Sequence, residues 1–192
     1  MAMLMLGLLL FLGTHSVRIA AEPWRTSVLA AGGAQRWKLA YTALSLTGFA
    51  LICWGYGQAR LTPQVLWASP LWTRHLAALL MLLAFVLLSA VYVPGNAIKA
   101  RLHHPMLLAV KVWALAHLLA NNTLADLLLF GSFLLWAVLD LRAARQRDRT
   151  LGTQYNPGSA ASTWLTLGLG AALWTVFAFW AHGWLIGVRP FG

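Results

Sequence analysis

Long apolar segments alternate with short polar connections along the whole chain. A window of about 20 residues, the length of helix that spans a bilayer, separates six such segments. They lie at residues 2–20, 39–57, 71–93, 105–121, 124–141 and 162–187. This pattern predicts an all-α fold: a polytopic membrane bundle of about six transmembrane helices, forming a single transmembrane domain over residues 1–192.

Turn-forming residues separate the six segments. Pro105 is suited to the first turn of the short fourth helix, and Asn121-Asn122 predicts a tight turn into the fifth. Residues 2–20 resemble a signal peptide, but they lack a basic start and a cleavage motif of small residues. We therefore interpret this segment as a retained first helix.

Composition supports the membrane assignment. Hydrophobic residues make up 60% of the chain and charged residues 9%, so the 18 charged residues (14 basic and 4 acidic) are too few to cover a soluble domain of this size. The net charge of +10 is typical of basic loops beside anionic lipid. We expect membrane lipid as a partner and no nucleic acid.

The distribution of Lys and Arg predicts the orientation in the membrane. If Met1 is outside, three cations fall on the outer side, namely Arg60, Arg74 and Arg189. The other eleven, which include Arg18 and Lys111, fall on the inner side. By the positive-inside rule, both termini then face the periplasm or its equivalent.

Two of the six histidines lie several residues inside apolar helices. These are His15 and His117, and polar side chains inside hydrocarbon are functional candidates because burying them is costly. At 100° per residue, His117 shares a face with Trp113 and Asn121. Histidine is a common ligand of haem and of metal ions, and an apolar, aromatic patch would suit a flat macrocycle.

Other polar residues have competing explanations. His75, His103, His104 and His182 fit hydrated or hydrogen-bonded positions at the membrane interface. Lys111 would either neutralise a haem propionate or extend its side chain to the lipid headgroups. His15 lies about 20 Å from the outer surface and His117 about 12 Å, so pairing them needs tilted helices or a slanted haem.

Several chemistries find no support in the sequence. The single cysteine, Cys53, excludes an intramolecular disulfide and a CxxCH haem attachment site. We find no dinucleotide-binding, P-loop, zinc-protease or serine-hydrolase motif. No pair of acidic residues lies within the bilayer, as a proton-coupled transporter would normally require. No catalytic residue is assigned.

Four segments carry a resemblance to a known family. They are G13-T-H-S-V-R18, R74-H-L-A-A-L-L-M81, H104-P-M-L-L-A-V-K-V-W-A-L-A-H-L-L-A-N121 and F130-G-S-F-L-L-W-A137. They closely resemble the bacterial NnrU family, over nearly the whole chain. The resemblance implies a protein of the bacterial inner membrane. It also implies an association with denitrification, where the family is linked to nitrite and nitric-oxide reductase systems.

The NnrU family is in turn similar to 15-cis-zeta-carotene isomerase, a membrane haem b enzyme. Its axial ligands correspond to His15, in a His-Ser motif, and to His117, thirteen residues after His104. An alternative cysteine ligand of that enzyme corresponds to Ala114 here, and the Arg of its Arg-His-Pro motif corresponds to His103.

A second resemblance is to membrane S-adenosylmethionine methyltransferases of the isoprenylcysteine type. Their R-H-P-x-Y-x-G motif reads H103-H-P-M-L-L-A109 here, without the Arg, the Tyr and the Gly. The sequence also offers no convincing acidic partner downstream of this motif. We therefore favour a methyltransferase less than a haem-binding protein or a haem-dependent isomerase.

These resemblances together predict a haem b site between the first and fourth apolar segments. His15 and His117 are the expected axial ligands, Arg18 and Lys111 the expected propionate partners, and Trp113 and Asn121 the expected pocket residues. The predicted role is electron transfer, sensing or another haem-related task in denitrification and nitric oxide metabolism, with a nitrite or nitric-oxide reductase or another redox protein as partner. The alternative is a haem-dependent cis–trans isomerase, so whether the protein is an enzyme stays open.

Overall fold

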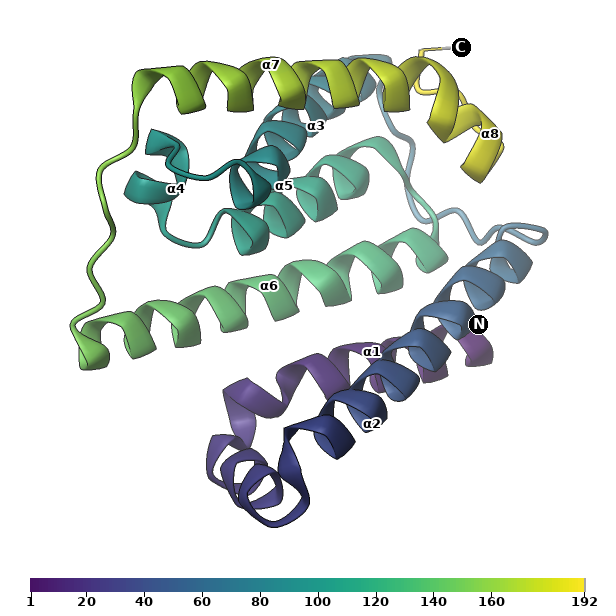
Figure 1. The fold of residues 1–192 in the computed structure, drawn as a ribbon. Coiled ribbons are helices and arrows are strands. Elements are labelled where there is room, and N and C mark those ends of the chain that lie inside the picture. Colours follow the sequence, from purple (N-terminus) through teal and green to yellow (C-terminus); the bar gives the residue numbers. More distant parts are fainter. Residues whose placement is uncertain (192) are drawn as a thin grey trace. The chain divides into compact units, whose positions relative to one another are not determined.

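The computed structural model describes residues 1–191, and these residues form helices and connections without a β-strand (Figure 1). The helices are α1 (Ala2–Ala20), α2 (Glu22–Ala59), α3 (Leu71–Tyr92), α4 (Ala97–Leu102), α5 (Pro105–Ala120), α6 (Leu124–Leu151), α7 (Ala160–Val176), the π-helical turn η1 (Phe177–Ala181) and α8 (His182–Ile186). Within the described residues, five helical segments are long and apolar enough to cross a membrane, and α5 is a shorter apolar helix. The prediction of an all-α, multi-pass membrane protein is confirmed.

Two helices are longer than their apolar segments. α2 begins at Glu22 and contains a kink at Gly33, whose φ of 80° lies in the left-handed region that glycine adopts without strain. α6 continues to Leu151, ten residues beyond the predicted end at 141. That extension is rich in Arg, which favours helix without being apolar. In these two helices, hydropathy therefore predicted the apolar part, but not the start of α2 or the end of α6.

The chain groups into two compact units. Unit 1 comprises residues 1–68 and 122–140, and unit 2 comprises residues 69–121 and 141–191. α6 contributes its first part to unit 1 and its second part to unit 2. The single transmembrane domain stays a prediction.

In unit 1, α1 and α2 pack closely along a seam of glycines. A Cβ added to Gly7 would lie 2.6 Å from the backbone nitrogen of Ile52, and one added to Gly48 would lie 2.7 Å from that of Phe11. A Cβ at Gly55 would collide with the backbone nitrogen of Leu4. Small residues allow this close approach of two membrane helices. Because Leu4 meets Gly55 and Phe11 meets Gly48, the two helices run antiparallel.

The first part of α6 is attached to α2 by a buried carboxylate. The Tyr56 hydroxyl donates to Asp126 Oδ1 over 2.5 Å. Asp126 Oδ2 also accepts from the backbone N–H of Thr123 over 3.0 Å, and the Thr123 hydroxyl accepts from the Asp126 backbone N–H over 3.2 Å. This reciprocal pair is a capping box at the start of α6. Asp126 is therefore structural.

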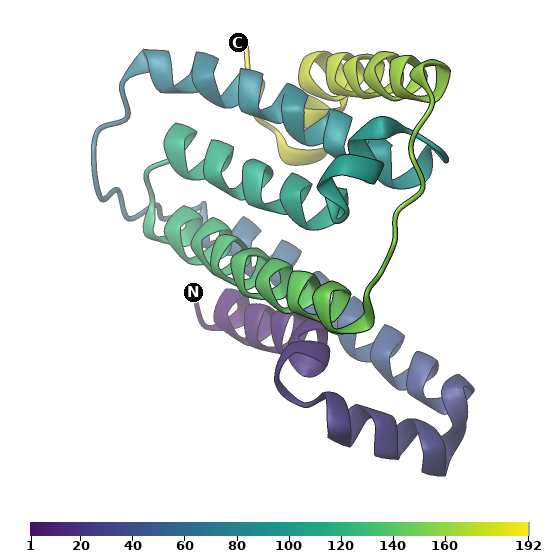
Figure 2. The ribbon, with the colours of Figure 1, turned by 90° about the vertical axis from the view of Figure 1, so that its left-hand side faces the viewer.

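In unit 2, α3 lies between α5 and α7 (Figure 2). α7 approaches α3 closely at Gly170, where an added Cβ would lie 2.6 Å from Val86 Cα. Just beyond the C-terminal end of α3, the buried Asn96 side chain donates to the Ala90 carbonyl over 3.0 Å and accepts from the Lys99 backbone N–H over 2.8 Å. Asn96 thereby caps the start of α4 and also hydrogen-bonds a carbonyl near the end of α3.

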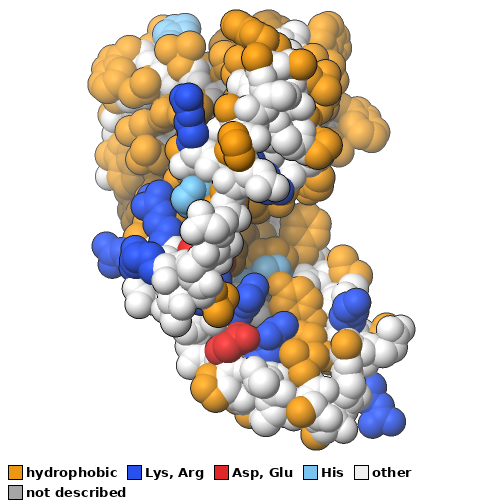
Figure 3. Space-filling view, turned by 60° about the vertical axis from the view of Figure 1, so that its left-hand side comes forward, with side chains coloured by type: hydrophobic (Ala, Val, Ile, Leu, Met, Phe, Trp, Pro, Cys, Tyr) orange, Lys and Arg blue, Asp and Glu red, His pale blue; other side chains and the backbone are white. Residues whose placement is uncertain are grey.

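Large hydrophobic side chains cover much of the surface, as Figure 3 shows for one face. Leu9, Leu79, Trp164 and Trp184 are each more than 60% exposed. Such a surface would cause a soluble protein to aggregate, whereas lipid tails solvate it. The exposed surface thus supports a membrane location independently of helix length.

Candidate functional site

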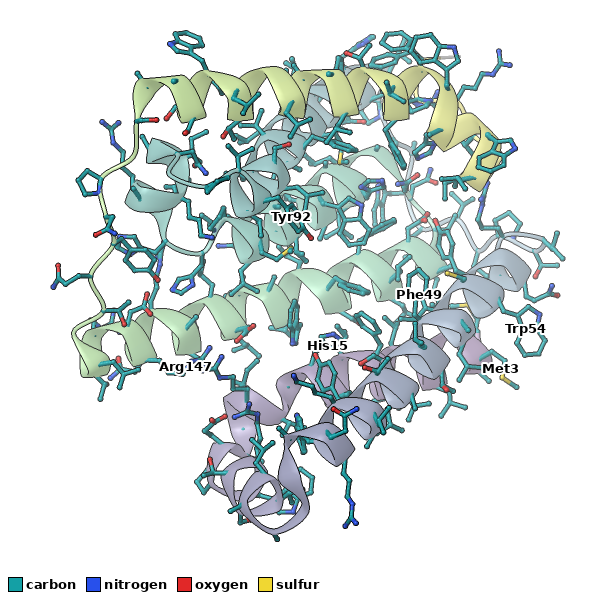
Figure 4. All side chains as sticks on the ribbon, in the orientation of Figure 1. Met3, His15, Phe49, Trp54, Tyr92 and Arg147 are labelled. Atoms are coloured by element: carbon teal, nitrogen blue, oxygen red, sulfur yellow. The ribbon has the colours of Figure 1, made fainter. Side chains whose placement is uncertain are left out.

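His15 lies in an aromatic cluster of unit 1, on the face of α1 that packs against α2 (Figure 4). Its half-buried ring stacks on Phe11 with the ring centroids 4.2 Å apart. The ring centroid of Tyr41 of α2 lies 5.2 Å from that of His15. The ring of Trp136 of α6 is perpendicular to the His15 ring, with the centroids 6.1 Å apart. The patch is apolar and aromatic, as the sequence predicted for this histidine.

The hydrogen bond of His15 determines its tautomer. Nδ1 lies 2.7 Å from the Phe11 carbonyl oxygen, which can only accept, so Nδ1 carries the proton. In a neutral ring, Nε2 then carries the lone pair. Histidines that bind metal usually have their other ring N–H held by a carbonyl or carboxylate in this way. The indole Nε1 of Trp136 is buried without a hydrogen-bond partner, so this cluster also holds an unused donor.

A groove of about 520 Å³ adjoins this cluster. Thr14 and Val17 of α1 line it from one side, and Trp37 and Tyr41 of α2 line it from the other. It reaches the Gly33 kink, because the change of direction in α2 moves the early part of that helix away from the seam. Tyr41 therefore contacts both His15 and the groove.

Arg18 lies beyond the aromatic cluster, one turn after His15. Its side chain is 59% exposed, and its Nε lies 3.9 Å from Glu22 Oε2. Glu22 also pairs with Arg25 over 2.9 Å. Arg18 thus belongs to a small charged group where α1 meets α2, and its contact with a propionate stays a prediction.

His117 lies in unit 2, in the last turn of α5. Its Nδ1 donates to the Trp113 carbonyl over 2.8 Å, and its ring lies 5.3 Å from that of Trp113. The Asn121 side chain donates to the His117 carbonyl over 2.9 Å. The three residues that helical spacing placed on one face therefore contact one another. The bond of Nδ1 to the carbonyl four residues earlier repeats the arrangement at His15.

A cavity of about 210 Å³ opens beside His117 within unit 2. Its polar lining includes His182, Asn121 and two arginines, Arg74 and Arg189. Apolar and aromatic side chains complete the wall: Ala77, Ala78, Met81, Phe85, Ala116, Ala120, Trp174, Phe177, Ala178, Val188, Pro190 and Phe191. The sequence pointed to His117 and Asn121, but it assigned His182 to the membrane interface and gave Arg74 and Arg189 no site.

The π-helical turn η1 and the C-terminal tail build one side of this cavity. η1 provides Phe177 and Ala178, and π-helical turns are frequent at functional sites. α8 then ends at Ile186, and the φ of 76° at the following Gly187 reverses the chain. The reversed tail is held by a 2.6 Å hydrogen bond from His182 Nδ1 to the Val188 carbonyl.

Trp113 and Lys111 are absent from the lining of this cavity. Trp113 still supports the site, because its carbonyl orients His117. Lys111 lies nearly two turns before His117 and is half-buried. Its role as a propionate partner stays a prediction.

A second polar cluster in unit 2 surrounds Asp148, in the last turns of α6. His104 Nε2 donates to Asp148 Oδ2 over 2.8 Å, and the Tyr155 hydroxyl donates to the same atom over 2.9 Å. His103 stacks on Tyr155 with parallel rings 4.0 Å apart. Burial, and then the hydrogen bond to the carboxylate, raise the pKa of Tyr155, which keeps the phenol in its donating form.

This cluster corrects one expectation. The sequence offered no convincing acidic partner downstream of His104, but Asp148 accepts a hydrogen bond from it. The 44 residues between them left no local signal in the sequence. The Arg, Tyr and Gly of the methyltransferase motif remain absent, so the cluster is a structural tie between the start of α5 and the end of α6.

The remaining histidine, His75, is exposed on α3. Within residues 1–191, no three His, Cys, Asp or Glu side chains are grouped so as to hold a metal ion.

Comparison with known proteins identifies one family. The family model described as NnrU protein matches residues 3–190, which is nearly the whole chain. No curated protein and no solved structure matches the chain.

Proposed function

Because the chain belongs to the NnrU family over nearly its whole length, we propose that this multi-pass membrane protein binds haem b and supports denitrification and nitric oxide metabolism. In the proposal, His15 and His117 are the axial ligands. The protein lies in the bacterial cytoplasmic membrane with both termini in the periplasm.

One observation carries the proposal: both histidines are held in the same way. Each donates Nδ1–H to the carbonyl four residues earlier in its own helix, over 2.7 Å for His15 and 2.8 Å for His117. Each neutral ring then carries its lone pair on Nε2, the atom that binds iron. Preorganisation of this kind lowers the cost of binding, because the ring does not have to be oriented by the ligand.

The surroundings of both histidines fit a porphyrin. Phe11, Tyr41 and Trp136 surround His15, and Trp113 lies against His117. Aromatic side chains of this kind pack well on a flat apolar ring. A haem bound here would supply one-electron redox chemistry. The chain itself orients the two imidazoles, and Asn121 fixes the end of α5 that carries His117.

Electron transfer is the role that two imidazole ligands favour. With both histidines bound to the iron, no coordination position would be left for a substrate, so the isomerase alternative would require one ligand to leave. The redox partner we propose is a nitrite or nitric-oxide reductase system. Arg18 and Lys111 stay the predicted partners of the propionates.

The experiment is a visible absorption spectrum of the purified protein, followed by haem titration of single variants. We expect a Soret band in the wild type. His15→Ala and His117→Ala should each lower haem affinity by about tenfold or more, since changes merely next to a metal ligand already cost that much. His75→Ala is the matched control, because His75 is an exposed histidine of the same chain.

Two outcomes would contradict the proposal. Absence of a Soret band after reconstitution with haem would exclude haem binding. Equal haem affinity in all three histidine variants would exclude His15 and His117 as ligands.

A further inference from the structure

The cavity beside His117 combines an apolar wall with two cations. Trp174, Phe177 and Phe85 supply aromatic surface, and Arg74 and Arg189 supply positive charge. No acidic side chain is among its lining residues. Its polar groups and its aromatic wall therefore suit different parts of one ligand, an anionic end and an apolar body.

Among the described residues, no acidic side chain forms an ion pair with Arg74 or Arg189. Glu22 pairs with Arg18 and Arg25, Asp126 accepts from Tyr56, and Asp148 accepts from His104 and Tyr155. Arg74 and Arg189 can therefore each donate to an anionic group of a ligand in this cavity.

The positions of the two arginines are unusual for a membrane protein. Of the 14 Lys and Arg residues, the positive-inside pattern places three on the outer side, and two of these three line this cavity. Positive charge is disfavoured on the outer side during insertion. A ligand-binding role would account for its presence there.

The structure holds Arg189 beside the cavity. Phe191 stacks on Phe179 with ring centroids 5.1 Å apart and meets Trp174 edge-on over 6.1 Å. Arg189 also packs over Gly183, because a Cβ added to this glycine would lie 3.2 Å from the Cγ of Arg189. Together with the reversal at Gly187, these contacts orient the tail so that Arg189 lines the same cavity as Arg74.

We propose that this cavity binds the carboxylate end of an otherwise apolar ligand, with Arg74 and Arg189 as the carboxylate partners. Arginine suits this task because its planar guanidinium can donate two parallel hydrogen bonds to one carboxylate. A cavity of about 210 Å³ accommodates the anionic end and the adjoining part of such a ligand, and the rest extends beyond it.

Two ligands share this chemistry, namely haem b through its propionates and a long-chain fatty acid. With haem as the ligand, the inference rests on the proposed function. It then assigns the propionates to Arg74 and Arg189 in place of Arg18 and Lys111.

The test compares each acid with its ester in the purified full-length protein. One probe pair is haem b and its dimethyl ester, followed by the Soret band. The other is the fluorescent polyene fatty acid cis-parinaric acid and its methyl ester. We expect the wild type to bind the acid about tenfold more tightly than the ester in at least one pair, which is the size of a charge-assisted hydrogen-bond contribution.

Four double variants locate the effect, and one of them, Arg18→Gln with Lys111→Gln, tests the propionate partners that the sequence predicted. Arg74→Gln with Arg189→Gln should reduce the acid-to-ester preference to about one, while Arg74→Lys with Arg189→Lys should keep part of it because the charge remains. The control is Arg142→Gln with Arg145→Gln, two exposed arginines on the part of α6 in unit 2. This control should keep the wild-type preference.

The outcomes separate this inference from the proposed function. A preference for the fatty acid alone, in a protein that binds no haem, supports the carboxylate site and contradicts the haem proposal. Tight haem binding without an acid preference supports the haem proposal and overturns the carboxylate site. The carboxylate site is also overturned if Arg18→Gln with Lys111→Gln abolishes the acid-to-ester preference while the Arg74 and Arg189 variants keep it. It is likewise overturned if the wild type shows no acid preference in either probe pair.

Discussion

Single polar side chains tie together segments of unit 2 that are distant in the sequence. Asp148 accepts hydrogen bonds from His104, at the start of α5, and from Tyr155, in the connection to α7. Each bond joins the last turns of α6 to another segment. A bond to a charged acceptor contributes more than one between neutral groups, even where water reaches it in part.

The contribution of Tyr155 can be isolated with a conservative variant. Tyr155→Phe keeps the ring that stacks on His103 and removes only the donor to Asp148. We expect it to cost about 1 kcal/mol of stability and to lower the apparent melting temperature in detergent. Tyr92→Phe is the control, because the Tyr92 side chain is 71% exposed. Equal melting temperatures in the two variants would contradict a role for this hydrogen bond.

At the scale of elements, the position of His15 depends on the packing of α1 against α2. The glycine seam brings the backbones together, and Leu4, Phe11 and His15 follow one another along the same side of α1. Tyr41 reaches His15 because α2 continues antiparallel past this face. Any side chain added in the seam should therefore disturb the aromatic cluster as well as the stability.

Gly55→Ala tests this dependence. The added methyl group would collide with the Leu4 backbone, which cannot rotate away as a flexible side chain could. We expect a loss of about 1–3 kcal/mol in thermal unfolding, as for other overpacked sites. Gly57→Ala in the same helix has no heavy atom within 4 Å and should be neutral or stabilising. Equal destabilisation by both changes would show that the seam is not closely packed.

At the scale of the whole molecule, charge predicts the orientation. Eleven of the 14 Lys and Arg residues fall on one side if Met1 is outside. The connection between α2 and α3 should then face the periplasm, and the connection between α6 and α7 should face the cytoplasm.

Cysteine labelling checks this orientation in a Cys53→Ser background, which removes the only native thiol. A cysteine replacing Thr62 should react with a membrane-impermeant maleimide in intact bacterial cells. A cysteine replacing Thr153 should react only after the membrane is opened. The reverse labelling pattern would contradict the predicted orientation.

The sequence by itself determined the helical membrane fold. A lipid environment requires every backbone polar group to be satisfied within its own segment, so apolar runs of about 20 residues already imply helices. Helical periodicity also placed Trp113, His117 and Asn121 together, because contacts between residues four positions apart depend on local geometry alone. The extended ends of α2 and α6 escaped prediction because their extra turns are not apolar.

Only the tertiary structure decided which distant residues share a site. Asp148 joins His104 across 44 residues, and the cavity beside His117 takes Arg74 from α3 and Arg189 from the tail beyond α8. These contacts depend on how helices pack and where the chain reverses, as at Gly187. Hydropathy and charge are properties of each segment, whereas a binding cavity is a property of several segments packed together.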